Sequence, residues 1–428
     1  MQEAPIIYNL FPLLAGPVAR WGDHLERIAS MGFNWIYLNP FQYPGFSGSL
    51  YAVKDYFRFH PLLLGSLGLD PFWLLENFLA ESKKRGLAVM LDLVVNHTAS
   101  DSLLVAQHPE WFARNPEGSI KHPSAIDPAD ARKVTVWGDL AELEYWPSPD
   151  PAGVLAFFKQ VADRYLSLGF SGFRCDAAYK VPGDFWARLI KAARQINPEV
   201  CFVAETLGCR LKEVTQLQES GFDFLYNSSK WWDFQEDWCL EQYEEFRRIA
   251  PSISFPETHD TPRLIVEAQG SLPRVRQRYL FAAFFSTGLL MPMGFEYGLK
   301  KKLHVVNSRP QDWQDRTYDL TDFITRVNQL KRNCPILQEE GPLERLTPPG
   351  QPVVILRKSS EVHPGVVLAV INATSKPQPQ VMLNCPQLMG FGTSALEELV
   401  PEAPTPPLGA EVTIDLKPWD LRLFYARP

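Results

Sequence analysis

Residues 88–95 read Ala-Val-Met-Leu-Asp-Leu-Val-Val, a nearly unbroken apolar run. Such a run is typical of a strand that is covered on both faces, as in a parallel sheet. Further strand candidates occur up to about residue 300, and stretches with helical spacing separate them. The eight candidates are Ile6–Leu10, Trp35–Leu38, Ala88–Val95, Gly172–Cys175, Cys201–Ala204, Phe222–Tyr226, Ile253–Phe255 and Leu289–Pro292.

The segments between these strands carry helix start signals. Asp70-Pro71 begins one helix, and Pro182 begins another whose apolar residues recur at helical spacing. Eight strand–helix alternations indicate an α/β fold of the (β/α)₈ TIM barrel type. An open doubly wound sheet is the alternative, but no glycine-rich phosphate turn follows the first strand.

Two regions depart from the alternation. The interval between the third and fourth strands is too long for one repeat, so residues 98–150 are expected to be an insertion over the C-terminal face of the barrel. The alternation ends with a closing helix over Asp319–Asn333. The Pro-rich remainder contains short strand-like runs. We therefore predict a catalytic barrel over residues 1–340 and a C-terminal antiparallel β-sandwich over 341–428.

Composition narrows the class of protein. The 428 residues carry a net charge of −7 without a long basic run, which argues against a nucleic-acid partner. The N-terminus lacks the pattern of a signal peptide, and no apolar stretch reaches the length of a membrane span. The six cysteines show no framework spacing, as expected for free thiols in a reducing cytoplasm. A cytoplasmic location without membrane association is therefore predicted.

Three carboxylates follow predicted strands and share one rim of the barrel. Asp176 ends the fourth strand, Glu205 the fifth, and Asp260 the seventh. In barrel enzymes, polar residues at the C-terminal ends of strands are the catalytic candidates. His97 and His259 lie near them in the sequence. Together these side chains indicate acid/base and nucleophilic chemistry on a sugar.

A retaining glycosidase needs one ionised carboxylate and one protonated carboxylic acid, which neighbouring strands can supply. Arg174 stands two residues before Asp176, so both can point into the barrel mouth, where the arginine would keep Asp176 ionised. Glu205 would then be the acid, and its surroundings should be drier or carry more like charge. Asp92 is instead expected to have a structural role, bonding near Arg174 or the strand ends.

Four segments in order resemble the α-amylase family of retaining glycoside hydrolases and transglycosidases. They are Asp92–His97, Gly172–Ala178, Val203–Glu205 and Phe255–Asp260. The resemblance implies that Asp176 is the nucleophile, Glu205 the general acid/base and Asp260 the residue that stabilises the transition state. It further implies that Tyr51, His97, Arg174 and His259 contact the sugar or orient the acids.

The chain also departs from the common family pattern. Many amylases carry Lys-His on the acceptor side after the nucleophile, where this chain has Tyr179 and Lys180. Residues 43–56 and 108–112 are more similar to the maltosyltransferase branch. No cofactor and no metal ligand set is predicted, and calcium is possible but not supported by the residues present.

These observations predict an α-glucan-active enzyme that acts on maltooligosaccharides through a covalent glycosyl-enzyme. Hydrolysis is the main interpretation, and maltosyl or glucosyl transfer is the alternative. A non-catalytic glycan-binding barrel is a third hypothesis. It would require a missing nucleophile or acid, whereas Asp176 and Glu205 are both present.

Overall fold

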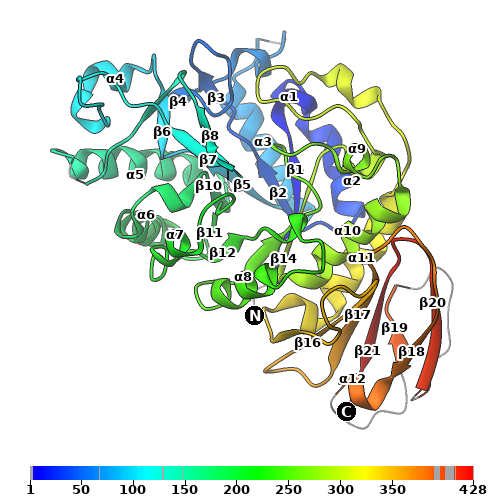
Figure 1. Ribbon diagram of the computed structural model, residues 1–428. Helices are drawn as coiled ribbons and strands as arrows, with labels where there is room; N and C mark the ends of the chain where they lie inside the picture. The colour runs from blue at the N-terminus through cyan, green and yellow to red at the C-terminus, as the bar shows by residue number, and fades with distance from the viewer. Residues whose placement is uncertain are drawn as a thin grey trace.

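The computed structural model describes residues 3–66, 68–127, 130–146, 148–389, 396–400, 409 and 411–427. A closed barrel of eight parallel strands lies at its centre, with helices outside it (Figure 1). The strands are β1 (Ile6–Leu10), β2 (Trp35–Leu38), β5 (Ala88–Leu93), β10 (Gly172–Cys175), β11 (Cys201–Ala204), β12 (Phe224–Tyr226), β13 (Ser252–Ser254) and β14 (Gly288–Pro292). The predicted (β/α)₈ barrel is confirmed, and the doubly wound alternative is wrong.

The third barrel strand is shorter than predicted. We expected it to continue to Val95, but β5 ends at Leu93. Beyond that point the backbone carbonyls accept hydrogen bonds from tyrosine side chains instead of a neighbouring strand. The Tyr56 hydroxyl donates to Val94 O at 2.8 Å, and the Tyr145 hydroxyl donates to Val95 O. The chain therefore leaves the sheet before the motif that ends at His97.

Two of the longer helices begin where an aspartate side chain caps them. Asp70 Oδ1 accepts a hydrogen bond from Phe72 N at 3.0 Å, and Asp150 Oδ1 accepts one from Gly153 N at 2.9 Å. In both cases a proline occupies the first helical position, where no amide hydrogen is needed. The longer helices are α3 (Pro71–Lys84), α5 (Pro151–Leu168), α6 (Gly183–Ile196), α8 (Trp238–Phe246), α10 (Leu272–Phe285) and α11 (Thr321–Asn333).

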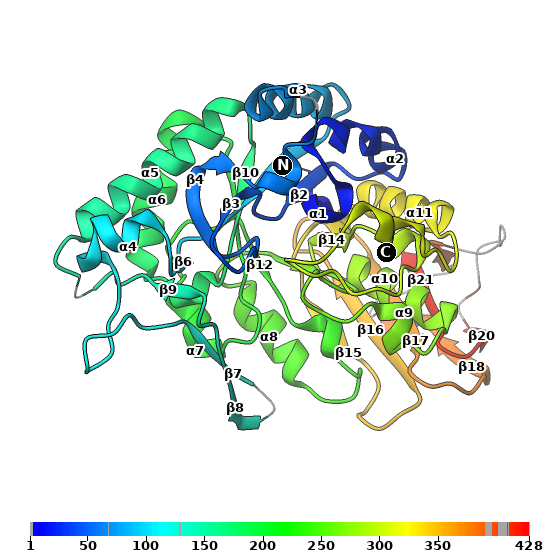
Figure 2. The same ribbon diagram turned by 90° about the horizontal axis from the view of Figure 1, so that it is seen from above.

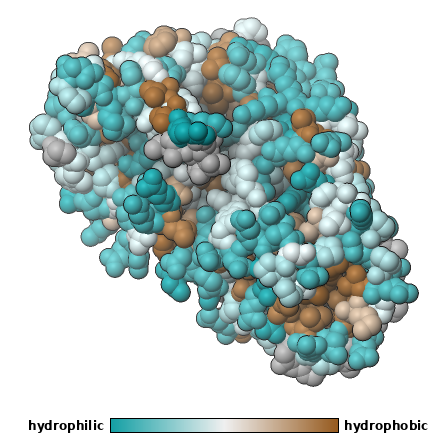
Figure 3. Space-filling model, in the orientation of Figure 1, coloured by the Kyte–Doolittle hydropathy of each residue, from teal (hydrophilic) through white to brown (hydrophobic). Residues whose placement is uncertain are grey.

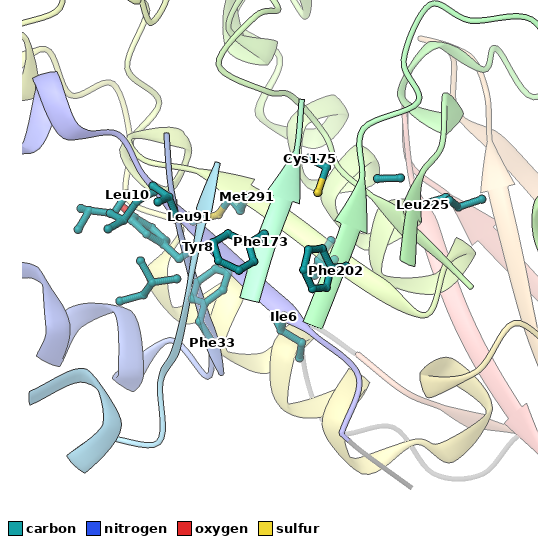
Figure 4. Close-up of a cluster of buried hydrophobic side chains, with 14 of the residues drawn as sticks. Ile6, Tyr8, Leu10, Phe33, Leu91, Phe173, Cys175, Phe202, Leu225 and Met291 are labelled. Carbon is teal, nitrogen blue, oxygen red and sulfur yellow. The ribbon is translucent and has the colours of Figure 1, made fainter. Parts of the chain in front are cut away.

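Alternate residues of each strand face opposite sides of the barrel wall. On β1, Ile6 and Tyr8 join the large cluster between the strands and the helices, whereas Ile7 joins the cluster inside the barrel. Phe173 and Phe202 pack together in the outer cluster, with ring centroids 5.3 Å apart (Figure 4). Because side chains fill the barrel interior, a substrate can bind only at its rim.

The insertion is tied to the end of the third repeat. Strand β6 (His97–Ala99) pairs antiparallel with β9 (Leu140–Glu142), so that His97 lies opposite Glu142. Between them lie α4 (Leu103–Gln107) and a hairpin of β7 (Ser124–Asp127) and β8 (Asp130–Val136). This pairing places the insertion beside the C-terminal rim.

The C-terminal region forms antiparallel sheets beside α10 and α11 (Figures 1 and 2). One sheet has the order β15-β16-β17-β21-β19, and β18 pairs with β20. The predicted β-sandwich fold is confirmed. Its strands are β15 (Leu343–Arg345), β16 (Val353–Ser359), β17 (Val366–Asn372), β18 (Gln378–Asn384), β19 (Glu397–Glu398), β20 (Glu411–Leu416) and β21 (Leu421–Ala426).

The surface in Figure 3 is mostly hydrophilic, and its hydrophobic side chains gather in separate patches. None of the helices among the described residues is long and apolar enough to cross a membrane.

A buried lysine donates hydrogen bonds to carbonyl groups at the C-terminal end of α10. The amine of Lys331, on α11, donates to the carbonyls of Ala283 at 2.9 Å, Ser286 at 2.6 Å and Leu337 at 2.8 Å. The first two carbonyls lie at the C-terminal end of α10, where the helix dipole favours a positive charge. Burial lowers the pKa of Lys331, so these three bonds offset the cost of enclosing the amine.

We therefore expect Lys331→Met to lower the free energy of unfolding by about 2–4 kcal/mol, because three buried carbonyls lose their donor. Urea-induced unfolding, followed by circular dichroism, measures this change. Lys83→Met is the matched control, since Lys83 is exposed in the last turn of α3. Equal losses in the two variants would contradict the assigned role of Lys331.

Candidate active site

A cavity of about 360 Å³ opens at the C-terminal ends of the barrel strands. Seven of the nine predicted site residues line this cavity, and Arg174 and His259 contact the carboxylates from behind it. The seven are Tyr51, His97, Asp176, Tyr179, Lys180, Glu205 and Asp260. The parallel register brings together residues that are more than 200 positions apart in the chain.

Arg174 is the centre of the charge network. On β10 it pairs with Asp92 of β5 on one side and Val203 of β11 on the other. Its Nη1 atom donates to both carboxylate oxygens of Asp92, at 3.0 and 2.9 Å, and to Asp176 Oδ1 at 2.8 Å. Its Nη2 atom lies 3.9 Å from Glu205 Oε2. One buried guanidinium therefore joins three carboxylates, and the expected bond between Asp92 and Arg174 is present.

Glu205 occupies a different environment from Asp176. Its Oε2 accepts a hydrogen bond from Ala177 N at 2.8 Å, and its Oε1 accepts one from Leu207 N at 3.0 Å. Burial raises the pKa of Glu205 to about 7, although the positive charge of Arg174 opposes the rise. The negative charge of Asp176 also raises the pKa of Glu205. Glu205 can therefore exchange a proton near neutral pH.

Asp260 lies at the mouth of the cavity, with 64% of its side chain exposed. Its Oδ2 lies 2.9 Å from His259 Nε2. Desolvation acts to raise the pKa of Asp260, but His259, together with the charges of Arg174 and Lys302, outweighs it and lowers that pKa to about 2. The Asp260 carboxylate is therefore available as a negative charge at the rim.

Tyr51 connects this rim to the network of Arg174. Its hydroxyl donates to Asp92 Oδ2 at 2.7 Å and lies 2.8 Å from His259 Nε2. The rings of Tyr51 and His259 are nearly parallel, with centroids 5.4 Å apart. His97 contacts the backbone of Tyr51, with its Nε2 atom 3.1 Å from Tyr51 O. Burial lowers the pKa of His97, which favours a neutral imidazole.

Tyr179 and Lys180 line the side of the cavity near the insertion. The Lys180 amine donates to Ser124 O on β7, and the Tyr179 carbonyl accepts a hydrogen bond from Gln216. Burial lowers the pKa of Lys180. The insertion and the loop after β10 thus form one wall.

Tyr37, Trp137 and Ala177 are among the contributors that were not predicted as site residues from the sequence. Tyr37 donates to Asp92 Oδ2 at 2.5 Å, and Trp137 lines the cavity. Ala177 adopts a left-handed conformation, with φ of 41°, and this turn directs its amide at Glu205. A strained backbone is common at functional sites, but an alanine gives no signal for it in a sequence.

No group of three or more histidine, cysteine, aspartate or glutamate side chains forms a metal-binding arrangement within the described ranges. The amide nitrogen of Asn96, which lines the cavity, lies 3.3 Å from His97 Nδ1.

A barrel whose rim carries these acids and this arginine resembles the enzymes that act on glycosidic bonds. Residues 4–117 match the family model "Glycogen debranching enzyme, glucanotransferase domain". This match and the relatives described below support a member of the α-amylase family of glycoside hydrolases and transglycosidases, near its maltosyltransferase branch.

The chain is similar in sequence to proteins named alpha-1,4-glucan:maltose-1-phosphate maltosyltransferase, two of which are described here. The one from Burkholderia pseudomallei is 26% identical over 400 residues, which cover 90% of this chain and 34% of the relative. The one from Arcanobacterium haemolyticum is 29% identical over 378 residues, which cover 77% of this chain and 52% of the relative. The chain thus spans a third to about half of these relatives.

Solved structures show the same fold at low sequence identity. The α-amylase from H. orenii has a TM-score of 0.77 and 15% identity, with full coverage of both chains. The Nostoc punctiforme debranching enzyme has a TM-score of 0.74 and 17% identity, with 98% of each chain covered.

Proposed function

We propose that this protein is a retaining α-glucan-active enzyme that cleaves α-1,4-linked maltooligosaccharides. The observation that carries the proposal is the contrast between two acids of one cavity. Asp176 bonds to Arg174 at 2.8 Å, whereas burial raises the pKa of Glu205 to about 7. Carboxyl groups with such different surroundings suit the roles of nucleophile and proton donor.

The first step forms a covalent glycosyl-enzyme. An Asp176 oxygen attacks the anomeric carbon while Glu205 transfers its proton to the departing glycosidic oxygen. The product is a β-linked glycosyl ester of Asp176 and a shortened glucan with a free hydroxyl group. Asp260 supplies negative charge where positive charge develops on the sugar ring. Tyr51, His97 and His259 position the sugar and Asp260.

The second step restores the α configuration. The Glu205 carboxylate accepts a proton from the acceptor hydroxyl as the acceptor oxygen attacks the anomeric carbon and releases Asp176. Water is the acceptor in a hydrolase. Solvent can reach the cavity at Asp260, whose side chain is 64% exposed, which supports hydrolysis.

Glycosyl transfer to a glucan is the second candidate, and a separate observation favours it. The matched relatives are named maltosyltransferases, and the matching family model describes a glucanotransferase domain. Hydrolysis and transfer share the intermediate and differ in the acceptor that enters beside Tyr179 and Lys180.

Product analysis tests both candidates. We expect maltopentaose to give new reducing ends whose first-formed anomer, followed by proton NMR, is α. A β anomer formed first would contradict the retaining mechanism, and inertness toward all α-glucans would contradict the substrate class. Maltose 1-phosphate added to maltopentaose should give no product longer than maltopentaose in a hydrolase. Elongation by two glucose units with release of phosphate would identify a maltosyltransferase.

A further inference from the structure

The loop that carries Asp260 is closed by a buried ion pair. This loop connects β13 to the short helix α9 (Leu264–Glu267). Arg263 Nη1 donates to Glu257 Oε1 at 2.7 Å, and both side chains are at most 2% exposed. The other carboxylate oxygen of Glu257 accepts a hydrogen bond from Leu264 N. The ion pair therefore joins the beginning and the end of the segment that holds Asp260.

Arg263 also ties this loop to the loop after β14. Its Nη2 atom donates to Met293 O at 2.9 Å, and its Nε atom donates to Lys301 O at 3.1 Å. The loop after β14 forms part of the catalytic cavity, because Val305 lines it. Arg263 thus fixes two parts of the cavity rim relative to each other.

Asp260 depends on the backbone of its loop for its position. Its side chain is 64% exposed, so packing does little to hold it. Its amide donates to Thr258 Oγ1 at 3.2 Å, and the Thr258 amide donates to Thr261 Oγ1 at 3.0 Å. These bonds fold the residues around Asp260 into a turn. The ion pair between Glu257 and Arg263 holds the two ends of that turn.

Stability alone gives little reason for this ion pair. The removal of two charges from water costs several kcal/mol per ion, and apolar side chains of similar volume often stabilise a fold as well or better. The guanidinium of Arg263, however, uses three nitrogen atoms on three different partners. Such directional bonds fix a geometry, which is what a charged group needs when it acts on a transition state.

We propose that Glu257 and Arg263 are positioning residues that act on the reaction through Asp260. They hold the turn so that the carboxylate of Asp260 stands where positive charge develops on the sugar ring. A shift of about 1 Å in such a group can lower a rate about 10²-fold. The inference rests on the proposed function, since it assigns a task within that reaction.

A double-mutant cycle with α-maltosyl fluoride tests the coupling to Asp260. Glu257→Gln keeps the shape of the side chain and removes its charge. We expect it to lower kcat/KM about 10²-fold in the chain with Asp260. In the Asp260→Asn background the loss should be less than about threefold, because the group that the ion pair positions is already absent.

Arg263→Lys is a second variant, which tests the other partner of the ion pair. It keeps the positive charge, but a single amine cannot reach Glu257 and both carbonyl groups in the same directions. We expect kcat/KM to fall about tenfold with Asp260 present and to change little in the Asp260→Asn background.

Glu296→Gln is the matched control. Glu296 is also fully buried, with one carboxylate oxygen bonded to Arg27 and the other accepting from Gly294 N at 2.9 Å. It therefore has the same kinds of partner as Glu257. The same chemical change at this position should lower the free energy of unfolding in urea by a comparable amount and leave kcat/KM unchanged.

Several results would overturn the proposal. Equal losses from Glu257→Gln with and without the Asp260 carboxylate would indicate a general distortion of the site. Full activity in Glu257→Gln, full activity in Asp260→Asn, or an equal loss in Glu296→Gln would also contradict it. If the unaltered protein turns over neither maltopentaose nor α-maltosyl fluoride, the proposed function itself fails, and the positioning role fails with it.

Discussion

Asp176→Asn should lower kcat for maltopentaose by at least about 10⁴-fold, because the proposed nucleophile is lost while its surroundings persist. Arg174 keeps its two hydrogen bonds to Asp92, at 3.0 and 2.9 Å, so the network behind the cavity stays paired. The loss should be equally severe with α-maltosyl fluoride, since a good leaving group does not replace a nucleophile. Initial rates with the two substrates measure the effect.

A matched control and a rescue experiment sharpen this test. Asp163→Asn makes the same chemical change on the outer face of α5 and should keep full activity. In Asp176→Ala, azide can enter from the side that the carboxylate occupied, displace fluoride from α-maltosyl fluoride and form β-maltosyl azide. An α-configured azide, or normal turnover in Asp176→Asn, would remove Asp176 from the nucleophile's role.

The residues whose location was predictable are those whose position depends on strand direction alone. Parallel strands end at one rim, so the order of Asp176, Glu205 and Asp260 along the chain was sufficient to bring them together. The bounds of β1, β2, β10 and β11 were also predicted correctly. These strands are short and wholly buried.

Other parts of the site depend on contacts that a local pattern does not contain. Tyr37 looked like an ordinary strand residue, yet its hydroxyl reaches Asp92, 55 positions away. The buried hydrogen bond from Arg263 to Glu257, 2.7 Å long, also joins two side chains that no local sequence pattern relates. It links the segment before Asp260 to the loop after β14, since Arg263 also donates to Met293 O at 2.9 Å. Such pairs appear only after the chain is folded.

Glu205→Gln should lower kcat/KM for maltopentaose by about 10³-fold or more, because an amide cannot protonate the leaving oxygen. The substituted side chain keeps one oxygen that can accept a hydrogen bond from the Ala177 or the Leu207 amide, so the loop after β11 should move little. With α-maltosyl fluoride the first step should survive, since fluoride leaves without a proton. The second step lacks its base, so a maltosyl ester should accumulate on Asp176, detectable by mass spectrometry of the intact protein.

The pH profile of the unaltered enzyme should report the same group. Since burial raises the pKa of Glu205 to about 7, the acid form is depleted above that pH, and kcat/KM for maltopentaose should fall about tenfold per pH unit on the alkaline side. For α-maltosyl fluoride this alkaline fall should be absent from kcat/KM, because glycosylation then needs no acid. The alkaline fall should also disappear in Glu205→Gln, whose residual rate with maltopentaose no longer depends on that proton. A fall near pH 7 that persists in Glu205→Gln would assign the acid to another residue.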